Sequence, residues 1–358
     1  MTAIRCNSHL NYLHGANMTP SRSTRECDFA VFQTLANYCL HLILAFGLIL
    51  ASVPVYAQAF PSKPVRLIVP VPAGSGLDTI SRQFGQRLAL VWGQPVVVEN
   101  RVGANFILGT EHVARSAPDG YTLLVAPDAA LTVNPHLYAK LPYDPVKDLA
   151  PVTQLVTFTQ MLVAAASMPA NSIAELVTYS KANPGRISYA SFGVGSQPHL
   201  LGEMVKFRTG ADFTHVPYKG IPQALTAVIA GETQLTWSSP FSIVGHIRSG
   251  KLKALALAAA QRTPLLPEVP TFAELGMPDI EYTQWFGLFA PATTPRPLID
   301  RIHADFSRLL TDPEVRDREL VGKGYEPSGL APDLFAALIR REIGLRGQLV
   351  KRIGARAE

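Results

Sequence analysis

Short apolar strands alternate with helical periodicities along this chain from residue 65 onward. The run Val65–Val69 is rich in β-branched residues, stops at Pro70 and is followed by a loop of small residues. Apolar residues then recur every three or four positions over residues 80–92, which predicts a helix with one buried face. Strand-like runs follow at residues 96–98 and 121–126. Such an alternation predicts a mainly parallel sheet covered by helices on both faces.

The same alternation resumes beyond a proline-rich connection at residues 141–145. Ser172 and Glu175 form a capping box that opens a helix, and a second glycine-containing loop follows the next strand. The sequence therefore predicts two α/β units, and 358 residues are enough for each to bury its own core. Further strands are expected at residues 161–166, 187–190, 214–216, 234–237 and 252–257, further helices at 200–207 and 223–230, and a helical tail from residue 297.

Residues 1–59 are predicted to be a secretory leader. The apolar run at residues 40–55 is too short and too interrupted for a convincing spanning helix, and small residues follow it. An A-x-A pattern places cleavage near Ala59, with a fallback near Ala57; the alternative is an uncleaved anchor. The three cysteines all lie in this segment, so the mature chain would lack a disulfide, a thiol nucleophile and a cysteine metal ligand.

Charge and motif patterns exclude several classes of function. The net charge is only +5 and there is no run of Lys and Arg, so nucleic acid is not expected as a partner. The dinucleotide fingerprint G-x-G-x-x-G fails twice, because Thr79 and Pro198 stand at its third glycine position. The phosphate loop, the nucleophile elbow and the H-E-x-x-H zinc motif are also missing from the sequence. We therefore predict no catalytic residue, no metal and no cofactor.

Two glycine loops remain as the chemical signal. Each lies between a strand and a helix, where unpaired backbone N–H groups and the helix dipole favour an anion. Gly74-Ser75-Gly76 precedes the first helix, and Gly193-Val194-Gly195-Ser196 precedes a later one. Each loop alone could be no more than a tight turn, but two of them in two units favour binding of a carboxylate-sized group.

Neighbouring side chains have two interpretations each. Asp78 could cap its helix or accept a hydrogen bond from a ligand, and His199 could order its loop or donate to a ligand. Four aromatic residues could line the binding site, but such residues more often belong to the core; they are Tyr218, Trp237, Phe241 and Trp285.

Several segments together resemble the TctC/Bug family, the extracytoplasmic solute receptors of tripartite tricarboxylate transporters. The resemblance runs from about residue 60 to beyond residue 329. Its blocks include Pro61-Ser62-Lys63-Pro64-Val65-Arg66-Leu67-Ile68-Val69-Pro70, Val98-Glu99-Asn100-Arg101, Ala117-Pro118-Asp119-Gly120-Tyr121, Val216-Pro217-Tyr218-Lys219-Gly220 and Leu266-Pro267-Glu268-Val269-Pro270. It implies an α/β two-domain periplasmic binding protein of type II-like architecture, with the ligand cleft between the domains. The expected division is residues 60–163 with 283–358 as domain I and residues 164–282 as domain II.

The resemblance also implies a function and a site. The receptor would capture a di- or tricarboxylate, an acidic amino acid or an aromatic acid by hinge closure and deliver it to TctA/TctB-like membrane permease subunits. Hinges are expected near residues 157–166 and 281–288, and a monomer is expected. Docking on a sensor kinase without transport is the alternative. The expected ligand-binding residues are Ala73, Gly74, Ser75, Gly76, Asp78, Asn100, Ser191, Gly193, Val194, Gly195, Ser196, His199, Tyr218 and Ser238.

The sequence departs from the family pattern at several points near this site. Ser75 stands where the first loop usually has a glycine, and Asn105-Phe106 replace a frequent pair of glycines. Ala227 replaces a frequent aspartate, and Trp237 brings a bulky indole near the expected cleft. The identity of the ligand therefore does not follow from the resemblance. A Ser196→Asp change is expected to weaken carboxylate binding at least about tenfold, because it places a like charge in the second loop.

Overall fold

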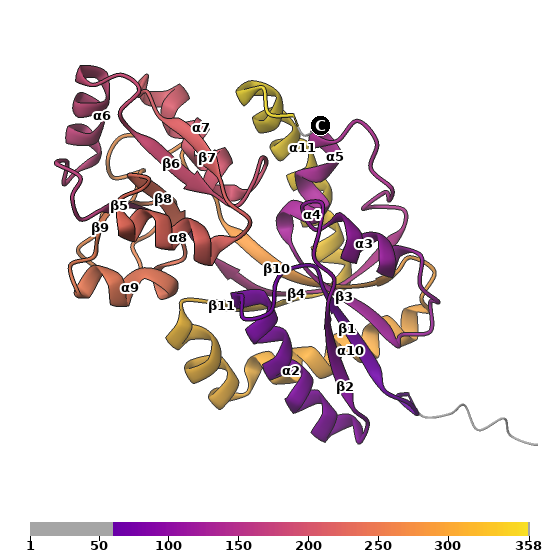
Figure 1. The fold of residues 1–358 in the computed structure, drawn as a ribbon. Helices are drawn as coiled ribbons and strands as arrows, with labels where there is room; N and C mark the ends of the chain where they lie inside the picture. Colours follow the sequence, from indigo (N-terminus) through magenta and orange to yellow (C-terminus); the bar gives the residue numbers. More distant parts are fainter. Residues whose placement is uncertain (1–59, 357–358) are drawn as a thin grey trace, which may run out of the picture. The chain divides into compact units, whose positions relative to one another are not determined.

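The computed structural model describes residues 60–356, which form two β-sheets flanked by helices (Figure 1). The expected leader lies outside the described residues. Within residues 60–356, no helix combines the length and the apolar character needed to cross a membrane. The strands are β1 (Val65–Val69), β2 (Val96–Asn100), β3 (Thr122–Pro127), β4 (Leu149–Phe158), β5 (Met161–Ala165), β6 (Ser188–Ser191), β7 (Thr214–Pro217), β8 (Leu235–Ser238), β9 (Leu252–Leu257), β10 (Gln284–Pro291) and β11 (Glu326–Leu330). The helices are α2 (Gly76–Trp92), α3 (Ile107–Ala114), α4 (Asp128–Thr132), α5 (Asn134–Leu137), α6 (Ile173–Ala182), α7 (Gln197–Thr209), α8 (Ile221–Ala230), α9 (Pro240–Arg248), α10 (Arg296–Thr311) and α11 (Pro332–Ile353), with short η1 (Glu314–Leu320) and η2 (Val321–Lys323).

The first sheet has six strands in the order β11-β4-β10-β3-β1-β2. Strand β1 pairs in parallel with β2 and β3, as the alternation of strands and helices predicts. Strand β10 pairs antiparallel with both β3 and β4, and β11 pairs antiparallel with β4. The second sheet has the order β7-β6-β8-β5-β9, with β6 parallel to β7 and β8, and β5 antiparallel to β8 and β9. Strands β5 and β10 each follow a crossing from one sheet to the other, and both pair antiparallel with their two neighbours.

Alternating side chains of β1 belong to two different cores, as the two-residue period of a strand requires. Leu67 and Val69 pack with Phe84 of α2 and Phe306 of α10 on one face of the sheet. Ile68 packs on the other face, against α3, α4 and α11. Burial on both faces explains why β1 reads as a continuous apolar run.

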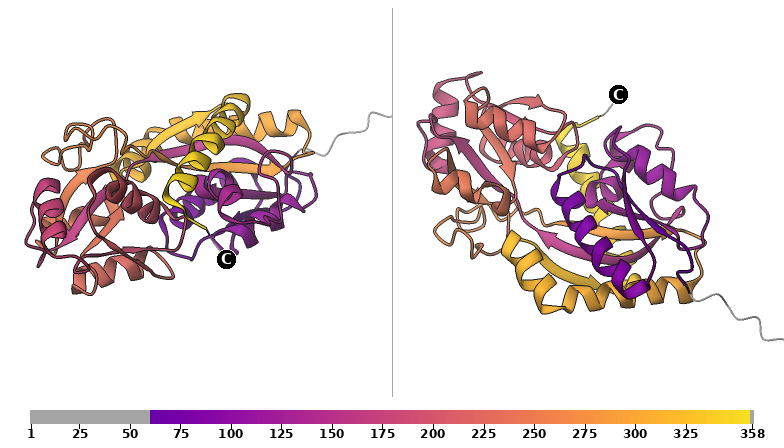
Figure 2. Two further views of the ribbon diagram at one scale, coloured as in Figure 1. Left: turned by 90° about the horizontal axis from the view of Figure 1, so that it is seen from above. Right: turned by 60° about the horizontal axis from the view of Figure 1, so that its bottom comes forward.

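The second sheet is also covered on both faces. Helices α6 and α7 contribute to one core, and α8 and α9 to the other. The core beneath α7 also contains residues of α4, α5 and the end of α11, which are joined along the chain to the first sheet. Helix α11 contacts β4, α4, α5 and α7, and in Figure 2 it runs from the first sheet toward α7.

The chain crosses between the sheets twice, at residues 159–160 and over residues 258–283. Gln160 in the first crossing donates a hydrogen bond from Nε2 to Oε1 of Gln284 at the start of β10. Strand β5 lies wholly in the second sheet, so a division of the chain by sheet would begin domain II at Met161 rather than at residue 164. The expected division into domains remains a proposal with that adjustment.

The tail is not wholly helical, which corrects the sequence prediction. Strand β11 lies between η2 and α11 and extends the first sheet at its edge. Its sequence, Glu-Pro-Ser-Gly-Leu, lacks alternating apolar residues. An edge strand with a proline and a glycine carries no periodic signal, so pairing with β4 alone defines it.

Candidate ligand site at the two glycine loops

The first glycine loop connects β1 to α2. Ser75 is the N-cap of α2, and its Oγ accepts a hydrogen bond from the N–H of Asp78 at 3.4 Å. Gly74 has a φ of +82°, which glycine adopts without steric cost. Gly76 also has to be glycine, because a Cβ there would lie 2.2 Å from the hydroxyl oxygen of Tyr325. Ala73, Gly74 and Gly76 are exposed, so the tip of the loop is open to solvent.

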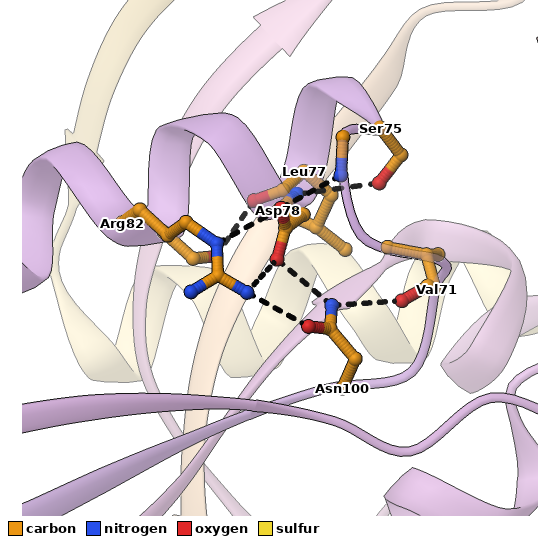
Figure 3. Close-up of polar contacts among 8 residues, drawn as sticks. Val71, Ser75, Leu77, Asp78, Arg82 and Asn100 are labelled. Carbon is orange, nitrogen blue, oxygen red and sulfur yellow. Dashed lines mark hydrogen bonds and ion pairs between the residues drawn. The ribbon is translucent and has the colours of Figure 1, made fainter.

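Asp78 organises this loop rather than capping α2 as its N-cap, which is Ser75. Its carboxylate accepts from Gly74 N–H at 2.8 Å, from Arg82 Nε at 3.0 Å and from Asn100 Nδ2 at 2.8 Å, and it also pairs with Arg82 Nη2 at 2.9 Å (Figure 3). Burial opposes its ionisation, but the bonds from Arg82, Gly74 and Asn100 outweigh that cost and lower the pKa of Asp78. With four donors on two oxygens, the acceptor capacity of Asp78 is filled by the protein.

Asn100 ties the end of β2 to the same loop. Its Nδ2 donates to the carbonyl oxygen of Val71 at 3.0 Å as well as to Asp78, and its Oδ1 accepts from Arg82 Nη2 at 2.8 Å. Figure 3 shows Asn100 reaching from the strand toward Val71 and Asp78. Because β1 and β2 are parallel, their carboxyl ends lie at one edge of the sheet, and Asn100 braces the loop from its neighbour.

The second glycine loop connects β6 to α7. Ser196 is the N-cap residue of α7, but its hydroxyl donates within the loop, to Gly193 O at 2.6 Å. Ser191 Oγ accepts from Gly193 N–H at 3.0 Å. Both serines are fully buried, and Val194 packs against the core beneath α7. The two hydroxyls therefore shape the loop, and they are not free donors at its surface.

Two histidines, His199 and His215, form hydrogen bonds with residues of the second loop or next to it. His199 Nδ1 accepts from Gly195 N–H at 3.1 Å, so this nitrogen carries no proton. His215, which the sequence did not single out, lies 2.6 Å from Ser191 Oγ through Nε2. The two rings are 4.3 Å apart between centroids. Burial lowers the pKa of His199, and burial together with the nearby His199 lowers the pKa of His215 to about 4. A single histidine within β7 offers no pattern that could have predicted this role.

The remaining candidates fall into two groups. Tyr218 is half-buried beside the second loop, and its N–H donates to Ser191 O at 2.8 Å. Ser238 is buried at the end of β8, where it pairs with Met161 of β5. The indoles of Trp237 and Trp285 are core residues, the first stacked on Phe272 and the second bonded to Glu342. Both tryptophans therefore belong to the core, which is the second of the two interpretations that the sequence allows.

A left-handed turn between β2 and α3 was not predicted from the sequence. Ala104, Asn105 and Phe106 have φ values of +46°, +49° and +75°, and Phe106 leads directly into α3. Non-glycine residues seldom adopt this conformation, and three in a row are held only by their surroundings. Asn134, fully buried at the start of α5, accepts from Asn105 Nδ2 at 2.8 Å and donates to Asn105 O at 2.7 Å.

The site offers backbone donors rather than reactive groups. Over residues 60–356, no cluster of three or more His, Cys, Asp or Glu side chains could hold a metal ion. Within that range, the N–H groups of Gly76 and Leu77 in α2, and of Gln197 and His199 in α7, meet no acceptor. Free amides at two helix starts can bind carboxylate oxygens without a charged side chain.

Several solved structures are similar to this chain, and two of them contain a bound carboxylate. The periplasmic binding protein BugD is 31% identical, with a TM-score of 0.77 over 84% of this chain and 100% of its own. MatC from Rhodopseudomonas palustris, solved with bound malate, is 33% identical, with a TM-score of 0.75 over 81% of this chain and 100% of its own. Rpa4515 from R. palustris, solved with adipate, is 30% identical, with a TM-score of 0.78 over 82% of this chain and 98% of its own.

The family assignment follows from the sequence directly. Residues 80–355 match the profile of TctC, the tripartite tricarboxylate transporter family receptor. This match spans most of the chain, including all of α7 and α2 from Ile80 onward. The family and the solved neighbours are solute-binding proteins and not enzymes. The chain therefore belongs to the TctC family of tripartite tricarboxylate transporter receptors.

Proposed function

We propose that this chain is a periplasmic receptor that captures a small carboxylate between its two glycine loops and passes it to a tripartite tricarboxylate-type permease. The observation that carries the proposal is the pair of helix starts with free amides, at Gly76 and Leu77 in α2 and at Gln197 and His199 in α7. Each pair of N–H groups suits one carboxylate, and the positive end of each helix dipole adds to the attraction. Two such loops fit a dicarboxylate, the ligand class present in the malate and adipate complexes of the neighbours.

Hinge closure would bring the second loop onto a ligand already held by the first. The crossings at residues 159–160 and 258–283 are the chain segments that such a motion would bend. The bond between Gln160 and Gln284 joins the first crossing to the start of β10, where the second crossing ends. A ligand shifts this equilibrium only through its higher affinity for the closed form. Export to the periplasm would remove the leader, and sequencing of the mature N-terminus tests this, with Gln58 or Phe60 expected as the first residue.

The site itself is tested best at Ala73, which is exposed at the tip of the first loop. Ser196 is less suitable than the sequence suggests, because Ser196→Asp would also bury a charge and break the bond to Gly193 O. Ala73→Asp adds a negative charge without a strained φ. Two like charges about 4 Å apart near a protein surface repel by up to ~4 kcal/mol, so we expect affinity to fall at least about tenfold.

Isothermal titration with malate and with adipate provides the measurement, and Ala73→Asn is the matched control. The asparagine variant has the same size as the aspartate variant without its charge, so it should stay within about threefold of the wild type. Equal affinities of the two variants would show that no anion is bound at the first loop.

A further inference from the structure

Asp128 is a fully buried carboxyl outside both glycine loops. It begins α4, directly after β3 of the first sheet. Its Oδ1 accepts from Gln197 Nε2 at 3.0 Å, and its Oδ2 accepts from the hydroxyl of Tyr282 at 3.1 Å. A buried carboxyl keeps such bonds only where they repay its desolvation, so this is a specific junction rather than a chance contact.

The two donors come from distant parts of the chain. Gln197 is the first residue of α7 and follows Ser196 of the second glycine loop. It is itself 2% exposed, so no water competes freely for its amide. Tyr282 lies in the second crossing, two residues before β10. Asp128 thus links the carboxyl end of β3 in the first sheet to the start of α7, which follows the second loop.

A second contact joins the same two regions. A Cβ added to Gly195 would lie 2.0 Å from Cδ1 of Leu137, so α5 is seated directly against the second loop. Leu137 is buried in the core beneath α7. The loop is therefore supported from the first sheet's helices at two points, one apolar and one polar.

Two charged side chains of α11 act on Asp128, the half-buried Arg346 and the buried Glu342. Arg346 of α11 stacks its guanidinium 3.5 Å from the ring centroid of Tyr282, and Glu342 of the same helix accepts from Trp285 Nε1 at 2.9 Å. Burial raises the pKa of Asp128 to about 7. The negative charge of Glu342 also raises this pKa, and the positive charge of Arg346 lowers it without cancelling the effect of burial. Near neutral pH the carboxyl is therefore close to its titration midpoint.

We propose that Asp128 is a positioning residue for the second glycine loop: its ionised carboxylate holds Gln197, and ligand affinity rises and falls with that bond. The inference rests on the proposed function for its link to affinity. An ionised carboxylate accepts charge-assisted bonds from both Gln197 and Tyr282. A protonated Asp128 can donate its O–H to the Tyr282 oxygen, but it then accepts from Gln197 only through a neutral carbonyl. The bond to Gln197 loses its charge assistance, so it weakens and the first turn of α7 loosens.

Hydrogen exchange over residues 193–200 tests the positioning without any ligand. In the wild type, exchange corrected for its chemical pH dependence should become about three- to tenfold faster in this segment as the pH falls from 8 to 6, as the charge-assisted bond is lost. Asp128→Asn mimics the protonated carboxyl, because it can only accept from Gln197 and donate to Tyr282 as a neutral group. This variant should therefore exchange at the fast rate at both pH values and show no such pH profile. Gln197→Ala should exchange fast at both pH values.

Tyr143→Phe is the matched control for a merely structural effect. It removes the bond from the Tyr143 hydroxyl to Ala130 O at 2.6 Å, which is buried on the same helix as Asp128 but does not reach α7. This variant should lose stability and keep the wild-type exchange at residues 193–200. The proposal is overturned if Asp128→Asn keeps the wild-type pH profile, or if Gln197→Ala exchanges like the wild type.

Titration with malate and adipate adds the functional readout. The second carboxyl of a dicarboxylic acid has a pKa above that of a single carboxyl, because the first negative charge disfavours its ionisation, but both acids remain mainly dianions between pH 6 and 8. Their own titration therefore changes the affinity by much less than about threefold in this window. Wild-type affinity should drop about three- to tenfold from pH 8 to pH 6 and that of Asp128→Asn should stay constant. If the wild type binds neither acid, the proposed carboxylate function fails, and the exchange experiment still decides the role of Asp128.

Discussion

At the scale of single residues, Asp78 holds the first loop in place through the hydrogen bonds that its carboxylate accepts from Gly74, Arg82 and Asn100. Replacing it with asparagine turns one of its oxygens into an N–H donor that faces Arg82 or Gly74 N–H. We expect the free energy of unfolding at pH 7 to fall by about 2–3 kcal/mol, because buried donors lose a charged acceptor. Urea denaturation gives this value. Asp317→Asn, which removes an exposed carboxylate paired with Arg316, should change stability by about 0.5 kcal/mol or less.

The difference in the free energy of unfolding between wild type and Asp78→Asn should depend on pH in a defined direction. The pKa of Asp78 is lower in the folded chain than its ordinary value of 3.8. Its contribution to stability is therefore fully present above that value and is lost as the pH falls through the lower, folded pKa. The difference in the free energy of unfolding between wild type and Asp78→Asn should therefore shrink as the pH falls below 3.8. A gap that stays constant from pH 7 to pH 3 would contradict the role assigned to the ionised carboxylate.

At the scale of elements, the left-handed turn before α3 depends on Asn134. Asn134→Ala removes both bonds to Asn105 and leaves the strained turn without its brace. We expect a loss of about 2–3 kcal/mol in the free energy of unfolding. In an Asn105→Gly background the same change should cost about 1 kcal/mol less, because glycine accepts the positive φ and has no side chain left unpaired. A cost that is equal in both backgrounds would mean that the pair does not hold the turn.

The sequence predicts elements well where local pattern and burial coincide. The β1–loop–α2 unit combines an apolar run, a small-residue loop and a helical period, and all three appear as expected. The left-handed turn at Phe106 and the short helices α4 and α5 carry no such pattern, because contacts with Asn134 and with a distant core define them. Of the candidate site, both loops were found, but the internal use of Ser191 and Ser196 and the roles of His215 and Asp128 depend on tertiary contacts.

At the scale of the molecule, the two sheets share a core. Helices α4 and α5 follow β3 of the first sheet, yet Leu137 packs beneath α7 of the second, against Gly195. The second loop therefore depends on residues from both parts of the chain. If that loop moves in a hinge motion, either α5 moves with it or the contact between Gly195 and Leu137 breaks. The contribution of this contact to stability can be tested.

The variant Gly195→Ala tests the contact between Gly195 and Leu137 through its effect on the free energy of unfolding. The new Cβ would meet Leu137 at 2.0 Å, in addition to the strain of a φ of +78°. Gly276 has the same φ of +78° and open space around it, so Gly276→Ala measures the strain alone, about 1–2 kcal/mol. Denaturation should show Gly195→Ala costing about 1–3 kcal/mol more than this control. In a Leu137→Ala background, which vacates the clashing atoms, the excess should disappear. If Gly195→Ala and Gly276→Ala cost the same in the wild-type background, α5 does not support the second loop, and the loop is free to move without it.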